Sequence, residues 1–255
     1  RRRPRALRLH ASSWPPPSVV RRSSWRIYVA TINAAEYDEA INAAERWGAR
    51  LVMASSPEAF GDNPHAMQTD NRSIFTPPEE HLRHSYGASK YLVEILAQDA
   101  VQRGLDVRIA RPCNAYGPRA SAGENGQVVA MMFERASYGH PLDVHGDGLQ
   151  TRSFTWVGDV VNGLDLLGRL DEAIDGSGSL AGASFNFGST VETSILDLAA
   201  RISSLTGAPV HHEGQGHPGD VKRRRPNPRS AETRLGWRAV TTLDEVLERT
   251  WSVLQ

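Results

Sequence analysis

The sequence predicts an α/β protein with a parallel sheet and a smaller, more irregular second lobe. Short, continuous apolar runs at residues 49–55 (ARLVMAS) and 105–112 (LDVRIARP) are typical of strands that are buried on both faces. Segments with a helical apolar period alternate with these runs along the chain. Such alternation is typical of parallel sheets, in which crossover helices join neighbouring strands.

The elements of the sheet are expected in the first half of the chain. A helix is predicted over Glu36–Trp47, with Gly48 just past its end. The first buried strand follows, and a polar, proline-rich loop then occupies residues 61–78. A long helix from about residue 85 to residue 103 stops at Gly104, and the second buried strand begins directly after it.

The second lobe is expected to begin with a helix near residues 126–139, where apolar side chains recur at helical spacing. Its remaining elements are predicted as strands at 141–146 and 152–157, a helix over Asp159–Leu170, a strand at 183–188, a helix opened by Ser194, and a C-terminal helix for which Thr242 is a good N-cap.

Composition excludes several classes of protein. A single cysteine among 255 residues excludes a disulfide scaffold and a cysteine-based zinc site, and it fits a reducing compartment such as the cytoplasm. No run of about 18 apolar residues is present, so we expect no membrane span. The formal net charge is zero, but the first 35 residues contain eight arginines and no acidic residue. The rest of the chain is therefore acidic.

The basic start of the chain does not resemble the part that follows. Residues 1–25 have no apolar period and include three consecutive prolines, Pro15 to Pro17, so we expect a disordered leader over residues 1–32. Three interpretations stay open: a basic arm for nucleic acid or anionic membrane, a transit peptide, or a truncated or wrongly joined start. Because no aromatic–basic interleaving or RNA-binding module follows, we favour the third and expect no nucleic-acid partner.

Three polar features follow the predicted elements in order. Ser55 and Ser56 lie at the carboxyl end of the first strand, the segment Tyr86–Lys90 (YGASK) lies on the next helix, and residues 111–118 (RPCNAYGP) follow the second strand. In an open parallel sheet, ligands bind outside the carboxyl ends of the strands. We therefore expect all three features to line one crevice.

The spacing of Tyr86 and Lys90 favours acid–base chemistry. Residues four apart share one face of a helix, and a lysine ammonium group beside a phenol favours the phenolate and lowers the tyrosine pKa. A phenolate near neutrality is a usable general base for a sugar hydroxyl, and a serine hydroxyl at the neighbouring strand end could hydrogen-bond the same oxygen. The alternative is a chance pair on a helix surface.

Six motifs in a fixed order resemble a known family. They are SSPEAFGD (55–62), YGASK (86–90), RPCNAYGPR (111–119), GDGLQTRSFTWVGDVVNGL (146–164), FNFGS (185–189) and PGDVKRRRPN (218–227). As a set they resemble the extended short-chain dehydrogenase/reductases, and more narrowly the nucleotide-sugar epimerases and dehydratases. The resemblance runs from about Asn33 to the C-terminus. It implies a Rossmann-like parallel sheet, NAD as cofactor, and a nucleotide-diphosphate sugar as substrate.

The resemblance implies a role for each residue of the crevice. Tyr86 would remove the proton from the sugar 4-hydroxyl while C4 delivers a hydride to NAD, giving a transient 4-keto sugar. Ser56 would assist that proton transfer, and Lys90 would hold the nicotinamide ribose. The residues placed along the cofactor are Ser55, Tyr86, Lys90, Arg111 and Pro112.

Two positions narrow the choice among the reactions that the resemblance implies. Glu58 matches the acid that dehydratases and decarboxylating relatives keep at this point of the motif. Dehydratases place an aspartate acid one residue earlier, where this chain has Pro57. That departure argues against 4,6-dehydration and leaves UDP-glucose 4-epimerase-like or UDP-glucuronate decarboxylase-like chemistry. The segment from residue 126 to residue 154 leans toward the decarboxylase branch.

The substrate side is also implied by position. Asn114 would contact the sugar or the diphosphate, Arg152 matches a phosphate-binding arginine, and Asp220 matches the acid that follows Pro-Gly. Arg224 lies in a basic run that would clamp the nucleotide, and the alternative for that run is a solvated basic loop. Epimerases often have arginine before the Pro-Gly pair, where this chain has His217.

The cofactor-binding start of such a fold is expected to be missing. The first glycine is Gly48, so no glycine-rich phosphate-binding turn precedes it, and the string Gly176–Gly182 follows a helix rather than a strand. We therefore expect a partial sheet without its N-terminal βαβ units. Residues 33–118 would form the remaining NAD-binding part and 119–255 mainly the substrate lobe, with 150–190 returning to the sheet. The alternative function is an inactive, nucleotide-sugar-binding remnant.

The other candidate functional residues, three histidines and one cysteine, are predicted to have no role in metal binding or catalysis. His211, His212 and His217 lack the spacing of a metal site, so we expect no metal. Cys113 is expected to pack as a small hydrophobic residue. The resemblance implies a homodimer formed through the helix that bears Tyr86 and Lys90, together with its neighbour.

Overall fold

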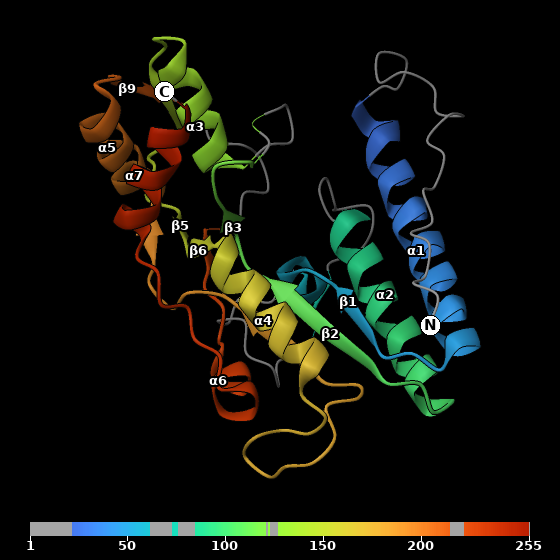
Figure 1. Ribbon diagram of the computed structural model, residues 1–255. Helices are drawn as coiled ribbons and strands as arrows, with labels where there is room; N and C mark the ends of the chain where they lie inside the picture. The colour runs from blue at the N-terminus through green and yellow to red at the C-terminus, as the bar shows by residue number, and fades with distance from the viewer. Residues whose placement is uncertain are drawn as a thin grey trace.

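The computed structural model describes residues 22–61, 73–75, 85–120, 122, 127–214 and 222–254, with side chains from residue 34 onward (Figure 1). Helices and short strands alternate along the chain. In order they are α1 (Arg22–Trp47), β1 (Leu51–Ala54), the 3-10 helix η2 (Pro57–Phe60), α2 (Ser85–Gln102), β2 (Val107–Pro112), β3 (Ala115–Tyr116), α3 (Val128–Ser137), β4 (Leu142–His145), β5 (Thr151–Arg152), β6 (Thr155–Trp156), α4 (Val157–Arg169), β7 (Ser184–Phe187), β8 (Thr193–Ser194), α5 (Ile195–Thr206), β9 (Val210–Glu213), β10 (Arg223–Arg224), α6 (Arg229–Leu235) and α7 (Leu243–Leu254).

The main sheet has the order β1-β2-β7, and both pairings are parallel. Successive side chains point to opposite faces of a strand, so alternate residues belong to different cores. Met53 and Ile109 pack under α1 and α2, whereas Val52 and Ala110 pack under α4 and α6. Helices therefore cover both faces of the sheet (Figure 1), and the predicted α/β fold with a parallel sheet is confirmed.

The second lobe has a hydrophobic core of its own. Helices α3, α5 and α7 lie together (Figure 1). Phe133, Leu198 and Leu247 belong to their shared core and are almost completely buried. Small sheets border this core: β4 pairs with β9 in parallel, and β5 lies between β10 and β8. The chain leaves the main sheet after β2 and returns to it with α4 and β7.

The first helix is longer than the sequence predicted. Helix α1 begins at Arg22, so residues 22–32 are helical where we expected a disordered leader. Neither glycine nor proline occurs between Pro17 and Gly48, so no helix-breaking residue interrupts this stretch. Our prediction extended the missing apolar period of residues 1–25 to residue 32, although Trp25, Tyr28, Val29 and Ile32 recur at helical spacing. Residues 1–21 lie outside the described part.

Helix α6 was not predicted, although its boundaries follow known rules. Pro228 precedes its first residue, and Gly236 ends it with a φ of +68°. Proline at the start and a left-handed glycine just past the end are typical helix signals. The helix has only seven residues, too few for the apolar period that we used to find the others.

Candidate active site

The predicted crevice residues meet at the carboxyl ends of β1 and β2. Ser56 follows β1 and caps η2, where its Oγ accepts a hydrogen bond from the amide of Glu58 at 3.2 Å. The hydroxyl of Ser56 also lies near the side chain of Tyr86, in the first turn of α2, and lowers the pKa of the tyrosine. The structure thus brings Ser56, Glu58 and Tyr86 together, from two segments that lie about 30 residues apart in the chain.

Gly87 allows α2 to approach η2 this closely. A Cβ atom added at this position would lie 2.6 Å from the carbonyl oxygen of Glu58, a distance that real Cβ atoms essentially never show. The glycine of the YGASK segment is therefore required by packing, because any side chain would push Tyr86 away from Ser56.

Burial dominates the acidity of Tyr86. Loss of water raises its pKa, the hydroxyl of Ser56 lowers it, and the nearby carboxylate of Glu58 raises it further, so that the pKa is above its ordinary value. We predicted that Lys90 would lower this pKa, and that prediction is wrong for the described structure. The Lys90 nitrogen lies 5.7 Å from the centre of the Tyr86 ring.

Lys90 donates its hydrogen bonds elsewhere. Its Nζ contacts the hydroxyl of Tyr37 and the carbonyl oxygen of Ala54, both at 3.2 Å. Tyr37, on α1, was not among the predicted site residues. No sequence signal pointed to it, because its contact with Lys90 depends on how α1 packs beside α2. Burial lowers the pKa of Lys90, and the charge of Glu36 partly opposes that effect.

Arg111 and Ser55 take part in a buried network centred on Glu94 of α2. The Nε of Arg111 lies 2.7 Å from one carboxylate oxygen of Glu94, and its Nη2 contacts the other. Ser55 Oγ donates to the first oxygen at 2.5 Å, and the guanidinium group lies over the ring of Phe60. We predicted both residues along the cofactor, but in the structure they tie α2 to β1 and β2.

Arg111 and Pro112 were also predicted to lie along the cofactor. Nη1 of Arg111 is buried and has no partner among the described residues. Pro112 is the last residue of β2 and pairs in register with Phe187. Both residues border the crevice, and their contact with a cofactor stays a prediction.

Glu58 and Arg224 form an ion pair that joins the two parts of the molecule. Nη2 of Arg224 lies 3.0 Å from one oxygen of Glu58, and Nη1 contacts the other. We predicted an acid at Glu58 and a nucleotide clamp at Arg224, but not their contact. Arg224 also aligns with Arg152 in the parallel pairing of β10 with β5, which places two arginines side by side.

Asn114 and Arg152 lie near the same end of the sheet. Asn114 has a φ of +43°, a left-handed conformation that is uncommon outside glycine, and its Nδ2 donates to the carbonyl oxygen of Ser153 at 2.8 Å. Arg152 donates to the carbonyl of Thr151 and to the side chain of Gln150. Asp220, the fourth predicted substrate residue, lies outside the described residues, as does His217.

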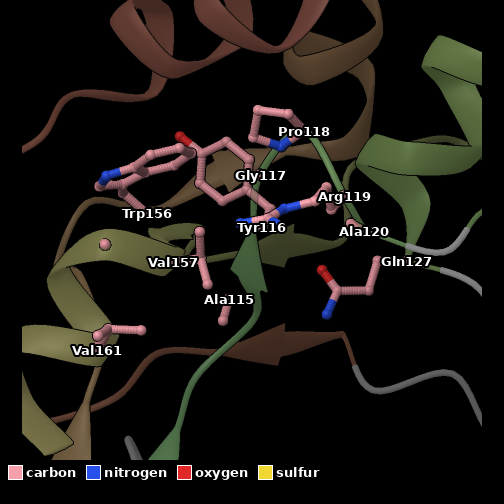
Figure 2. A pocket seen from close by; sticks show the side chains of 11 residues that line it. Ala115, Tyr116, Gly117, Pro118, Arg119, Ala120, Gln127, Trp156, Val157 and Val161 are labelled. Carbon is pink, nitrogen blue, oxygen red and sulfur yellow. The ribbon is translucent and has the colours of Figure 1, made fainter. Parts of the chain in front are cut away.

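A cavity of about 740 Å³ opens beside this region, between β3, β6 and the start of α4 (Figure 2). Its walls are mostly apolar, and none of the predicted site residues lines it. The first of its lining residues along the chain, Ala115, directly follows Asn114. The lining residues are Ala115, Tyr116, Gly117, Pro118, Arg119, Ala120, Gln127, Trp156, Val157, Gly158 and Val161.

The remaining candidates have structural partners. His211 lies 3.2 Å from Asp143 across the β4–β9 pair, and no group of metal-binding side chains is found among the described residues. Cys113 is fully buried, as we predicted, and burial raises the pKa of its thiol to about 12. Within the described part of the chain, no helix is both long and apolar enough to cross a membrane.

Known proteins resemble this chain over most of its length. A UDP-glucuronic acid decarboxylase 1 from Danio rerio is 35% identical over 213 residues, which are 81% of this chain and 47% of the relative. The chain thus spans about half the length of the curated relatives it matches. The structure of a UDP-glucose 4-epimerase with UDP-glucose from Thermotoga maritima superposes with a TM-score of 0.73 at 25% identity, covering 89% of this chain and 71% of that one.

A second solved structure, MoeE5 in complex with UDP-glucuronic acid and NAD, superposes with a TM-score of 0.73 at 27% identity. The match covers 87% of this chain and 70% of the MoeE5 chain. A model of the NAD dependent epimerase/dehydratase family matches residues 17–180, a region that begins 16 residues before the resemblance we found by motifs. Because this match spans more than half of the chain and includes Ser56, Tyr86 and Lys90, the chain belongs to the NAD dependent epimerase/dehydratase family.

Proposed function

We propose that this chain is part of an NAD-dependent enzyme that transiently oxidises C4 of a nucleotide-diphosphate sugar. Decarboxylation of a UDP-glucuronate-like sugar is the favoured outcome, and 4-epimerisation of a UDP-hexose is the second. The meeting of Ser56, Tyr86 and Glu58, in which the serine lowers the tyrosine pKa and the carboxylate raises it, supports this proposal most directly. The decarboxylases among the relatives, such as the Danio rerio protein, favour the first outcome.

Proton transfer at C4 is assigned to the Tyr86 oxygen. In its phenolate form this oxygen can take the proton of the 4-hydroxyl group and later return it. The Ser56 hydroxyl favours the phenolate, because it lowers the tyrosine pKa, whereas the Glu58 carboxylate opposes it. Glu58 pairs with Arg224 in the structure, and we assign its carboxylate to the step that distinguishes decarboxylation from epimerisation.

The described residues fit the nicotinamide end of NAD. A lysine ammonium group has three N–H donors, and the two contacts of Lys90 with Tyr37 and Ala54 leave one for a ribose hydroxyl. Lys90 also lies at the carboxyl end of β1, where dinucleotides bind to sheets of this kind. Bound there, NAD would supply the hydride acceptor. Among the described residues, no glycine-rich turn leads from a strand of the main sheet into a helix.

The arginines at the sheet edge suit a diphosphate, which Arg224 would bind in exchange for its ion pair with Glu58. Arg152 and Arg224 are aligned partners on parallel strands, so their side chains leave the pair on the same face. Guanidinium groups bind phosphate oxygens through two parallel hydrogen bonds. Asn114 is placed beside them by its bond to Ser153. Pro57 stands where a 4,6-dehydratase would have an acid, so dehydration is not the proposed outcome.

The test is a substrate panel. The chain is incubated with NAD and, separately, UDP-glucuronate, UDP-glucose and dTDP-glucose, and products are identified by mass spectrometry. We expect UDP-pentose and CO₂ from UDP-glucuronate. UDP-galactose from UDP-glucose would instead favour the epimerase outcome. Binding of a UDP-sugar with no product in any arm would refute the enzyme and favour the alternative, an inactive nucleotide-sugar-binding remnant.

We further propose a homodimer formed through the outer face of α1 and α2. Three apolar side chains of α2 are exposed there, namely Tyr91, Leu92 and Ile95. Light scattering on a sizing column would test this: Leu92→Glu should convert a dimer to a monomer, and a wild-type monomer would refute it. We also propose a cytoplasmic location, which the single, buried and unpaired cysteine supports.

A further inference from the structure

Three elements meet at the ammonium group of Lys90. The hydroxyl of Tyr37, on α1, donates to the carbonyl oxygen of Ala54, the last residue of β1. Lys90, on α2, donates to the oxygen of that same hydroxyl and to the same carbonyl. The Lys90 nitrogen also lies 4.8 Å from the centre of the Tyr37 ring, nearer than to the ring of Tyr86.

The hydrogen bonds at this point have defined directions. Tyr37 gives its only hydroxyl proton to Ala54, so its oxygen lone pairs face Lys90 as acceptors. The face of an aromatic ring attracts a cation at this distance, which adds to the hydrogen bond. Two of the three N–H groups of Lys90 are thereby oriented by the protein.

Lys90 requires such a partner because it is buried. Only 7% of its surface is exposed, and a buried ammonium group is unfavourable unless polar groups compensate it. No carboxylate of the described residues lies within ion-pair distance of it, and Glu36 acts only from farther away. Tyr37 therefore supplies, through a neutral hydroxyl and a ring face, what an acidic partner supplies elsewhere.

We propose that Tyr37 is a positioning residue, which holds the Lys90 ammonium group at the end of β1 so that its third N–H faces a hydroxyl-bearing ligand. The identity of that ligand, a ribose or sugar hydroxyl, rests on the proposed function. The contact between Tyr37 and Lys90 is independent of the proposed function. Among the described residues, the titratable neighbours of Lys90 are Tyr37 and Glu36 on α1 and Tyr86 on α2.

The composition of the chain makes a direct test possible. The sequence contains two lysines, Lys90 and Lys222, so protein labelled with [¹³Cε]lysine gives one carbon signal for each. Lys222→Arg removes one signal and assigns the other. A pH titration followed by NMR then yields the pKa of Lys90, with Lys222 as an internal reference in the same sample.

Tyr37→Phe keeps the ring and removes the hydroxyl, which is one of two acceptors of a buried ammonium group. We expect the pKa of Lys90 to fall by about one unit, and to fall further in Tyr37→Leu, which also removes the ring. The matched control is Tyr138→Phe, an exposed tyrosine of the second lobe, which should leave the Lys90 pKa unchanged. An unchanged pKa in a folded Tyr37→Phe chain overturns the proposal.

A reciprocal variant keeps the test decisive if Tyr37→Phe does not fold. Lys90→Met removes the cation beside Tyr37, and the pKa of the Tyr37 phenol, followed with [¹³Cζ]tyrosine, should rise. An unchanged Tyr37 pKa in this variant also overturns the proposal. Neither titration needs cofactor or turnover. A protein without activity on any sugar would therefore refute the proposed function and leave this inference intact.

Discussion

The ion pair between Arg111 and Glu94 offers the sharpest test of how the candidate site is built. Its side chains are only 9% and 10% exposed, and it joins β2 to the helix that bears Tyr86 and Lys90. Replacing Arg111 with Met leaves the Glu94 carboxylate buried, with the Ser55 hydroxyl as its remaining partner among the described residues. Removing one partner of a buried pair costs about 3–5 kcal/mol of unfolding free energy.

The expected change in melting temperature follows from the size of the chain. One kcal/mol shifts the midpoint of a protein of this size by about 2–4 °C, so Arg111→Met should lower it by roughly 6–20 °C. Thermal unfolding followed by circular dichroism measures this shift. The matched control is Arg249→Met, whose exposed pair with Glu245 is worth no more than about 1 kcal/mol.

A double variant separates the pair from its surroundings. Arg111→Met combined with Glu94→Leu removes both charges and leaves apolar groups of similar volume, which is often nearly neutral for a buried pair. We expect the double variant to recover most of the lost stability. A loss in Arg111→Met no larger than in Arg249→Met, or a double variant as unstable as the single one, would refute the assignment of Arg111 to a structural network.

Three further predictions concern the same end of the sheet. Ser56→Ala should raise the pKa of Tyr86, because it removes a hydroxyl that stabilises the phenolate, and Glu58→Gln should lower this pKa, because it removes a repelling charge. Titration of protein labelled with [¹³Cζ]tyrosine measures both shifts. Shifts of the same sign would contradict the account. Gly87→Ala should lower the free energy of unfolding, measured with urea, by about 1–3 kcal/mol, because its methyl group would meet the Glu58 carbonyl. An unchanged urea midpoint would argue against that contact. Cys113 should react with a thiol reagent only as fast as the chain unfolds, and rapid labelling of the native chain would contradict its burial.

Local patterns in the sequence predicted the parallel sheet and the meeting of Ser56 with Tyr86. Both predictions depend on helical spacing and on strand ends, which are properties of neighbouring residues. The acidity of Tyr86 could not be predicted in the same way. It depends on how much water the folded chain removes from the phenol, and that quantity is not encoded in the spacing of Tyr86 and Lys90.

Contacts between distant residues were also missed. Lys90 and Tyr37 are 53 residues apart, and Glu58 and Arg224 are 166 apart. Such pairs depend on how helices pack and on the register of short strands, for which a single sequence has no periodic signal. The charge of Arg224 pointed to a ligand, but its neighbour in the structure is an acidic side chain of the same protein.

Transfer of hydrogen from C4 tests the central claim most directly. The chain is mixed with NAD and UDP-glucuronate deuterated at C4, quenched at short times, and the nicotinamide ring is examined by mass spectrometry. We predict that deuterium enters the ring with wild-type protein, and that Tyr86→Phe binds the sugar nucleotide normally but transfers almost none. Equal transfer by Tyr86→Phe would contradict the role of Tyr86, and no transfer by the wild type would contradict the proposed reaction.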